Sequence, residues 1–261
     1  MKILAVIGSY RKNGNTSQVV AMVRAGLEKE AARTGVPVEV ETLHLGHCHI
    51  GACRGCRACF DRGEGACPVK DDLLAVKAKM KEADGVLVAS PVYVHDLSGV
   101  TKNWIDRLAH VCHRPEFAGK CAYLLATVGR SPTGHTLDSL HVALSTWGFC
   151  VAGKTGFKTG ALMNGDEVQR FQARTQKIAQ KLFHAIDRQR FARPSFRSLM
   201  TFKIQQRFWQ NVPQRNTVDY AYWSGQGWLA PGRDYYMAHE ASRVKVVLAR
   251  LAGAFLAPFV S

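Results

Sequence analysis

The sequence predicts an α/β protein: a doubly wound, five-stranded parallel sheet followed by a helical, aromatic-rich C-terminal extension. Apolar runs alternate with amphipathic stretches through residues 1–188, as they do in repeated βα units. From Arg190 onward prolines interrupt this pattern, and tryptophan and tyrosine become frequent. So many aromatic side chains are rarely left in solvent, which indicates an ordered extension with helices of its own. We therefore divide the chain into a first domain of residues 1–188 and an extension of residues 189–261.

Five apolar segments of strand length define the sheet, at residues 2–8, 36–45, 85–89, 120–127 and 149–156. The first is unbroken, as in a strand buried on both faces, and the second alternates. Helices are predicted between them at 16–33, 71–82, 99–110, 134–146 and 166–189. Asp71 and Asp72 begin the second helix, where negative charge favours the helix dipole. Ligands of such a sheet bind at the carboxyl ends of the strands, where the strand order reverses.

Charge is the most unusual property of the composition. The formal net charge is +15, and residues 189–261 contribute ten basic and three acidic side chains to it. This balance favours an anionic partner of some kind. No stretch of about 18 uncharged apolar residues predicts a membrane span. The sequence passes from Met1 directly into a strand without a leader pattern, so we expect a reducing, cytoplasmic setting.

Four cysteines lie close together between the second strand and the second helix. They are spaced Cys53-x2-Cys56-x2-Cys59-x7-Cys67, and Pro68 follows. Thiolates at these intervals converge on one soft metal centre, so the spacing predicts an iron–sulfur or zinc site within residues 48–67. Cys48 adds an alternative, because Cys48-x4-Cys53-x2-Cys56 is similar to the plant-type [2Fe–2S] spacing. A redox disulfide and unmetallated thiols also stay open.

A polar loop follows the first strand and reads GSYRKNGNTS over residues 8–17. It offers hydroxyls, an amide, the Arg11 guanidinium and the free N–H groups of a helix start, which together suit a phosphate. The loop has neither the Walker pattern nor G-x-G-x-x-G. The alternative interpretation is an Asn-Gly turn followed by a capped helix.

Three motifs together resemble a known family. The loop G-S-x-R-x-N-G-N-T-S, the segment SPVY at 90–93 and the segment KNWIDR at 102–107 resemble the flavodoxin-like NAD(P)H-dependent FMN reductases. With the cysteine motif, the chain is similar to the iron–sulfur flavoprotein branch of that family. The resemblance covers about residues 1–188 and implies a flavodoxin-like fold.

The resemblance also implies site residues, which we state as expectations. The FMN phosphate is expected on Ser9, Arg11, Asn13, Asn15, Thr16 and Ser17. The isoalloxazine ring is expected between Pro91, Val92 and Tyr93 on one side and Thr127 and Gly129 on the other. A [4Fe-4S] cluster is expected on Cys53, Cys56, Cys59 and Cys67, with zinc as the alternative. The chain departs from the usual family pattern at Val94, His95 and Arg130.

The expected function is that of an FMN-dependent oxidoreductase with a [4Fe-4S] cluster, in which the cofactors carry the chemistry and no side-chain acid–base pair is required. Electrons would pass between flavin, cluster and a ferredoxin-like carrier or small acceptor, with NAD(P)H as a candidate donor. One alternative is an NAD(P)H-dependent FMN or quinone reductase whose cysteine loop is structural or zinc-bound. Another is a non-catalytic electron-transfer or redox-sensing protein.

Partners follow from the same interpretation. The resemblance implies a homo-dimer or homo-tetramer. We expect no nucleic-acid partner, because no recognition motif is present. Residues 242–260 predict an amphipathic helix. Its apolar face is expected to pack on a neighbouring subunit or on the first domain, and an anionic membrane surface is the alternative.

Overall fold

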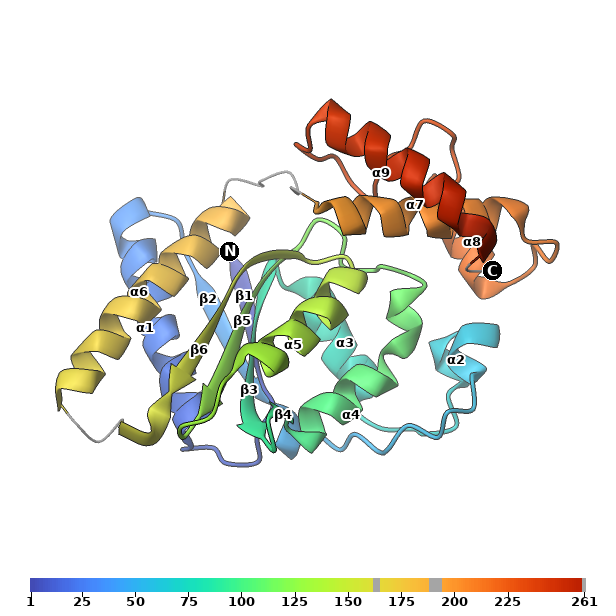
Figure 1. Cartoon of the computed structure of the whole chain (residues 1–261). Coiled ribbons are helices and arrows are strands. Elements are labelled where there is room, and N and C mark those ends of the chain that lie inside the picture. The colour runs from blue at the N-terminus through green and yellow to red at the C-terminus, as the bar shows by residue number, and fades with distance from the viewer. Residues whose placement is uncertain (162–164, 188–193, 260–261) are drawn as a thin grey trace.

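The fold is a sheet of six strands covered by helices on both faces, and a helical extension lies at one end (Figure 1). It comes from a computed structural model that describes residues 1–161, 165–187 and 194–259. The parallel strands are β1 (Lys2–Ile7), β2 (Glu39–His44), β3 (Gly85–Tyr93), β5 (Cys121–Val128) and β6 (Cys150–Lys158), in the order β2-β1-β3-β5-β6. The predicted five-stranded parallel sheet is therefore confirmed. Its order reverses between β1 and β3, which makes the ends of these strands the switch point.

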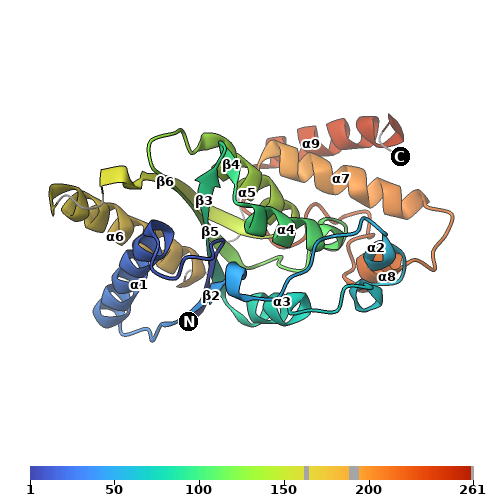
Figure 2. The ribbon, with the colours of Figure 1, turned by 90° about the horizontal axis from the view of Figure 1, so that it is seen from below.

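Helices cover the two faces of the sheet in separate layers (Figure 2). One face carries α1 (Asn15–Thr34) and α6 (Gly165–Asp187), and the other carries α3 (Leu73–Glu82), α4 (Gly99–Arg107) and α5 (Gly134–Thr146). Side chains of β1 alternate between the layers: Ile3 packs with α1 and α6, whereas Leu4 packs with α3 and α4. Both faces of β1 are thus buried, and this is why its sequence is an unbroken apolar run.

The segment after β3 differs from the prediction. We expected the third strand to end at Ala89, but β3 continues to Tyr93 and then pairs antiparallel with the short strand β4 (Asp96–Leu97). Val94 and His95 form the turn between them, both in the left-handed region, at φ 49° and 65°. Two residues with positive φ match the twist of a hairpin. SPVY is therefore the end of a strand rather than a loop.

Other helix boundaries differ by a few residues from those that the sequence predicts. The helix predicted at 99–110 ends at Arg107, and a 3-10 turn follows at Ala109–Cys112. Asp71 lies outside α3, because its carboxylate accepts hydrogen bonds from the N–H groups of Leu73 and Gly51. The predicted domain boundary at 188/189, and residue 189, where the fifth predicted helix was expected to end, lie outside the described residues.

The extension has its own aromatic core, as the sequence predicted. Its helices are α7 (Phe196–Asn211), α8 (Val218–Gly225) and α9 (Arg243–Leu256). Phe202, Trp223 and Trp228 are fully buried among them. The Trp223 indole donates a hydrogen bond to the His113 carbonyl at 2.7 Å, so this core is fastened to the first domain.

The C-terminal helix differs from the expectation in one respect. Its apolar side was expected to pack on a neighbouring subunit or on the first domain, but in this chain Val244, Leu251 and Phe255 are exposed, and α9 contacts α7 through its other side. Packing on the first domain is therefore wrong for this face. Val260 lies outside the described residues. Among the described helices we find none with the length and hydropathy needed to span a bilayer.

Candidate functional site

The first candidate site lies at the carboxyl ends of β1, β3 and β5. Gly8 stands at the end of β1 and donates its N–H to the Ala89 carbonyl at 2.8 Å. A Cβ at position 8 would lie 1.8 Å from Thr101 Oγ1, so only glycine fits there. The Ser98 hydroxyl donates to the Gly8 carbonyl at 2.6 Å. Strand β1 and the start of α4 are therefore held in close contact beneath the loop.

The loop over residues 9–14 leads into α1, whose N-terminus has no side-chain cap. Ser9 Oγ accepts a hydrogen bond from the Arg11 N–H at 3.1 Å, and the Ser17 hydroxyl donates to the Arg11 carbonyl at 3.2 Å. Gly14 is the N-cap of α1, and no side chain caps the helix. No acidic residue lies in the first turn either. An uncapped N-terminus with basic Arg11 beside it is suited to binding a phosphate.

Two of the predicted phosphate residues also connect this loop to its neighbours. The buried Thr16 hydroxyl lies 2.6 Å from Thr127 Oγ1, which joins α1 to the end of β5. The Asn15 amide donates to Thr159 Oγ1 at 3.0 Å, which joins the loop to the end of β6. The structure thus brings Thr127 to the loop that is predicted to bind phosphate. Sequence reasoning missed Thr159, whose only signal was its place directly after the last strand.

The predicted ring-contacting residues lie at the end of β3. Pro91 is buried and Val92 is half-buried against the core, whereas the Tyr93 side chain is 54% exposed. Val94 is 96% exposed and β-branched at positive φ, an unfavourable backbone conformation for this residue type. Such strain concentrates at ligand sites. Asn13 and Gly129 are exposed on the neighbouring loops.

The four predicted metal ligands line one cavity of about 160 Å³. Cys53 and Cys56 are exposed, and Cys59 and Cys67 are half-buried. Gly55 and Arg57 both have positive φ and fold the loop around the cavity. Cys48 is not among the lining residues, because its side chain packs against the core and its thiol donates to the His44 carbonyl at 3.5 Å.

Helix α4 holds the cysteine loop through two residues one turn apart. Asn103 accepts a hydrogen bond from the Cys53 N–H at 3.3 Å and donates to the Gly51 carbonyl at 3.1 Å. Arg107 donates to the Gly51 carbonyl at 2.8 Å, and its other terminal nitrogen lies 3.8 Å from Cys67 Sγ. Residues four apart share one helix face, so a single face of α4 reaches both ends of the loop. The sequence showed these residues only as part of a motif and assigned them no role.

The Arg107 guanidinium is itself held by Asp71. Both side chains are buried and form an ion pair. Burial alone would raise the pKa of Asp71, but the hydrogen bonds from Arg107 and from the Gly51 and Leu73 N–H groups lower it below its ordinary value. The charged pair therefore places a fixed cation beside the Cys67 sulfur.

A buried ionic network lies beside the cavity. Among the described residues, Glu64, His110 and Glu116 form a group of candidate metal ligands within 4.8 Å of one another. The ammonium of Lys77 lies at their centre, 2.7 Å from Glu64 and 3.2 Å from His110 Nε2, so the group is better described as the acceptors of a buried lysine. Burial, followed by the charge of Lys77, lowers the pKa of His110 to about 4. His110 is therefore neutral, with its proton on Nδ1.

Comparison with known proteins identifies the family. The profile of the NADPH-dependent FMN reductase family matches residues 1–161, which is more than half of the chain and includes both candidate sites. The chain belongs to the NADPH-dependent FMN reductase family. It is accordingly a flavin-dependent oxidoreductase.

Curated relatives place this chain in the iron–sulfur flavoprotein branch. An iron–sulfur flavoprotein of Archaeoglobus fulgidus is 29% identical over 231 residues, which cover 88% of this chain and 100% of the relative. Another, from Methanosarcina thermophila, is 31% identical over 171 residues, covering 64% of this chain and 85% of the relative.

Solved structures agree on the fold. An oxidoreductase from Corynebacterium diphtheriae has a TM-score of 0.56 at 22% identity and covers 72% of this chain and 98% of its own. A flavone reductase has a TM-score of 0.57 at 18% identity over 72% of this chain and 63% of its own.

The extension also contacts the cysteine site. Arg114 donates to the Cys59 carbonyl at 2.8 Å and forms a buried ion pair with Asp219 of α8. The other carboxylate oxygen of Asp219 lies 2.8 Å from His113 Nδ1. Nothing in the sequence indicated this contact, because Asp219 lies more than one hundred residues from Arg114.

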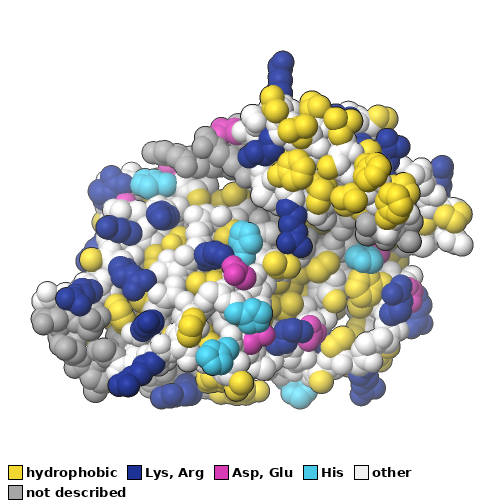
Figure 3. All heavy atoms as spheres, in the orientation of Figure 1, with side chains coloured by type: hydrophobic (Ala, Val, Ile, Leu, Met, Phe, Trp, Pro, Cys, Tyr) yellow, Lys and Arg dark blue, Asp and Glu magenta, His cyan; other side chains and the backbone are white. Residues whose placement is uncertain are grey.

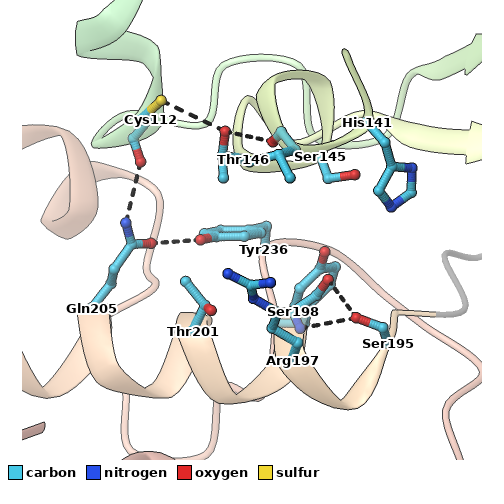
Figure 4. A pocket seen from close by; sticks show the side chains of 12 residues that line it. Cys112, His141, Ser145, Thr146, Ser195, Arg197, Ser198, Thr201, Gln205 and Tyr236 are labelled. Atoms are coloured by element: carbon cyan, nitrogen blue, oxygen red, sulfur yellow. Dashed lines mark hydrogen bonds between the residues drawn. The ribbon is translucent and has the colours of Figure 1, made fainter. Parts of the chain in front are cut away.

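A second cavity, of about 240 Å³, separates α5 from α7 (Figure 4). At one end Tyr236 donates to Gln205, which in turn donates to the Cys112 carbonyl at 3.1 Å. His141 and Arg197 lie toward the other end. The extension is therefore joined to the first domain by specific hydrogen bonds on one side of this cavity.

Proposed function

We propose that this chain is an FMN-dependent oxidoreductase that carries a [4Fe-4S] cluster on Cys53, Cys56, Cys59 and Cys67. The cavity lined by all four cysteines carries the proposal. FMN exchanges two electrons as hydride or one at a time and the cluster exchanges one, so together they link a two-electron donor or acceptor to a one-electron carrier. NAD(P)H is the proposed donor, and a ferredoxin-like protein or a small molecule is the proposed acceptor.

The residues at the strand ends fit FMN. The uncapped N-terminus of α1 offers N–H groups to a terminal phosphate, and Arg11 adds a cation. The hydroxyls of Ser9 and Thr16 are hydrogen-bonded to the Arg11 N–H and to Thr127, and these bonds set the shape of the loop. Tyr93 and the exposed turn at Val94 are in place to cover a planar ring.

The cysteine cavity suits an iron–sulfur cluster. Four cysteine thiolates are the usual ligands of a [4Fe-4S] cluster, and the cavity that all four line has a volume of about 160 Å³. Arg107 beside Cys67 would offset the negative charge of the bound centre.

A second candidate is an NADPH-dependent FMN or quinone reductase whose cysteine loop is structural. The description of the family, NADPH-dependent FMN reductase, favours this donor. Steady oxidation of NADPH would separate either enzyme from a non-catalytic electron-transfer protein.

Anaerobic purification with iron, sulfide, zinc and flavin analysis tests the proposal. We expect about four iron and four sulfide per FMN. Cys56→Ser should lose iron while FMN is retained, and Cys48→Ser should keep both. Zinc without iron, or iron loss in Cys48→Ser with full iron in Cys67→Ser, would overturn the proposed ligand set.

The phosphate assignment has its own test. Replacing both Arg11 and Thr16 with alanine removes a cation and the link to Thr127, so FMN affinity should fall by about 2–4 kcal/mol. Full flavin content in this double variant, measured by absorbance after gel filtration, would show that the phosphate binds elsewhere.

A further inference from the structure

The outer side of α9 is an exposed apolar surface. Val244, Val247, Leu248, Leu251 and Phe255 are between 53% and 71% exposed. Phe259, in the 3-10 turn after the helix, is 75% exposed, and Phe208 on α7 is 40% exposed. Figure 3 shows hydrophobic side chains gathered over the extension, with basic side chains among and around them. A soluble domain rarely leaves so continuous an apolar surface without a partner.

The arrangement around α9 separates two opposite faces. At 100° per residue, the five exposed side chains lie within an arc of about 100°. Val246, Ala249 and Gly253 lie on the opposite side and are buried against α7. A Cβ at Gly253 would lie 2.8 Å from the Met200 carbonyl oxygen, so α9 is closely seated on α7. Close packing of the opposite side of α9 on α7 therefore leaves the apolar face directed away from the protein.

Basic residues flank this face on both sides. Arg243 and Lys245 are exposed and project about 90° and about 110° from the middle of the apolar arc, on opposite sides of it. Arg250 lies on the Arg243 side and pairs with Asp234 at 2.8 Å. The sequence of α9 contains no acidic residue. A groove of about 370 Å³ lies where the ends of α7 and α9 meet, and it is lined by Arg207, Phe208 and Ala254 among others.

We propose that the outer face of α9 docks on the surface of an anionic lipid bilayer, with its apolar side chains in the acyl boundary and Arg243 and Lys245 at the headgroups. Long basic side chains at the edges of an apolar face can reach lipid phosphates while their stems stay in the apolar layer. A second copy of this chain fits less well, because pairing two such faces brings basic flanks together without acidic partners. This surface inference is independent of the cofactors.

Vesicle flotation of the full-length, flavin-loaded protein tests the proposal. We expect flotation with phosphatidylcholine vesicles that contain phosphatidylglycerol and little with phosphatidylcholine alone. Raising salt from about 0.1 M to about 1 M shortens the Debye length from about 10 Å to about 3 Å, so binding should weaken. Equal flotation with both vesicle types at both salt concentrations would contradict the role of charge.

Matched variants separate the apolar and the charged contributions. Leu251→Glu should lower the vesicle partition coefficient about tenfold or more, because it places a charge in the acyl boundary. Leu74→Glu, an exposed leucine on α3, is its control and should bind as the wild type does. Replacing both Arg243 and Lys245 with glutamine should lower partitioning about thirtyfold. The control pair, Lys29→Gln with Lys177→Gln, removes the same charge from other helices and should have a smaller effect.

Two outcomes would overturn the proposal. One is undiminished vesicle binding by Leu251→Glu. The other is absence of vesicle binding by the wild type; a change from oligomer to monomer in Leu251→Glu, measured by light scattering, would then assign the face to a second copy. Because Leu251 is exposed, thermal unfolding should be unchanged in this variant, and that measurement confirms that the fold is intact.

Discussion

At the scale of single residues, Gly8 shows how closely the loop after β1 packs against α4. A methyl group at this position would meet Thr101 Oγ1 at 1.8 Å. We expect Gly8→Ala to lower the free energy of unfolding by about 1–3 kcal/mol, as overpacking does, and to weaken FMN binding. Urea unfolding and flavin titration measure the two effects.

Two further variants make the Gly8 prediction specific. Gly99→Ala has no heavy atom within 4 Å of the new Cβ and should behave as the wild type does. Adding Thr101→Ala to Gly8→Ala removes the nearest clashing atom and should recover part of the lost stability. If Gly8→Ala were as stable as Gly99→Ala, the close approach of Gly8 to Thr101 would be contradicted.

Glu30 is a buried carboxylate that links α1 to α6. Its oxygens accept hydrogen bonds from Gln176 and Gln180 at 2.9 Å and from Arg33. Burial alone would raise the pKa of Glu30, but these hydrogen bonds lower it below the ordinary value of 4.5. A depressed carboxylate pKa contributes stability above the unfolded-state pKa, and that stability is lost as the pH falls below it.

Glu30→Gln tests this linkage. At pH 7 the substitution should cost about 1–3 kcal/mol of unfolding free energy, since hydrogen bonds to a charged group are lost. Below about pH 4.5 the gap in unfolding free energy between variant and wild type should narrow, because Glu30 then takes up a proton in the unfolded state more readily than in the folded state. Glu28→Gln, an exposed glutamate on the same helix, serves as the control. A gap that stayed constant from pH 7 to pH 3 would argue against a depressed pKa.

At the scale of elements, α4 acts as the support of the cysteine loop. Asn103 holds the loop near Cys53, and Arg107 holds it near Cys67. Removing the guanidinium also leaves the Asp71 carboxylate buried and unpaired, which typically costs about 3–5 kcal/mol. We therefore expect Arg107→Gln to lose iron and to make the loop sensitive to proteolysis, while FMN is retained.

Lys102→Gln is the matched control for Arg107→Gln. Lys102 lies on the same helix in an exposed pair with Asp106 at 2.6 Å, and such pairs contribute about 1 kcal/mol or less. It should keep its iron and its resistance to protease. Equal iron content in the two variants would show that α4 does not support the proposed metal site through Arg107.

At the scale of the whole molecule, the extension supports the cysteine site from outside. Asp219 of α8 pairs with Arg114, and Arg114 donates to the Cys59 carbonyl. Asp219→Asn should therefore loosen Cys59 and speed the loss of iron to a chelator severalfold. Asp234→Asn, which breaks the partly exposed pair with Arg250, should not change the rate. Identical rates in both variants would show that the extension does not support the site.

Several features of the fold were predictable because they depend on neighbours in the sequence. Strand β1 is buried on both faces and reads as an unbroken apolar run. The end of β3 was harder to predict, since Val94 adopts positive φ although a β-branched residue rarely does. Pairing of Val92 with Leu97 outweighs that local preference, and such a contact does not show in a window of sequence.

The sequence by itself determined the alternating strands and helices, the polar loop after β1 and the four clustered cysteines, because periodicity, loop composition and short spacing are properties of contiguous residues. Only the tertiary structure decided what surrounds these residues. It brought Arg107 to Cys67 across 40 residues and Asp219 to Arg114 across 105, and it turned the apolar side of α9 outward. These contacts depend on how helices pack against one another, and one helix face looks the same in sequence whether it meets a neighbour, a lipid surface or water.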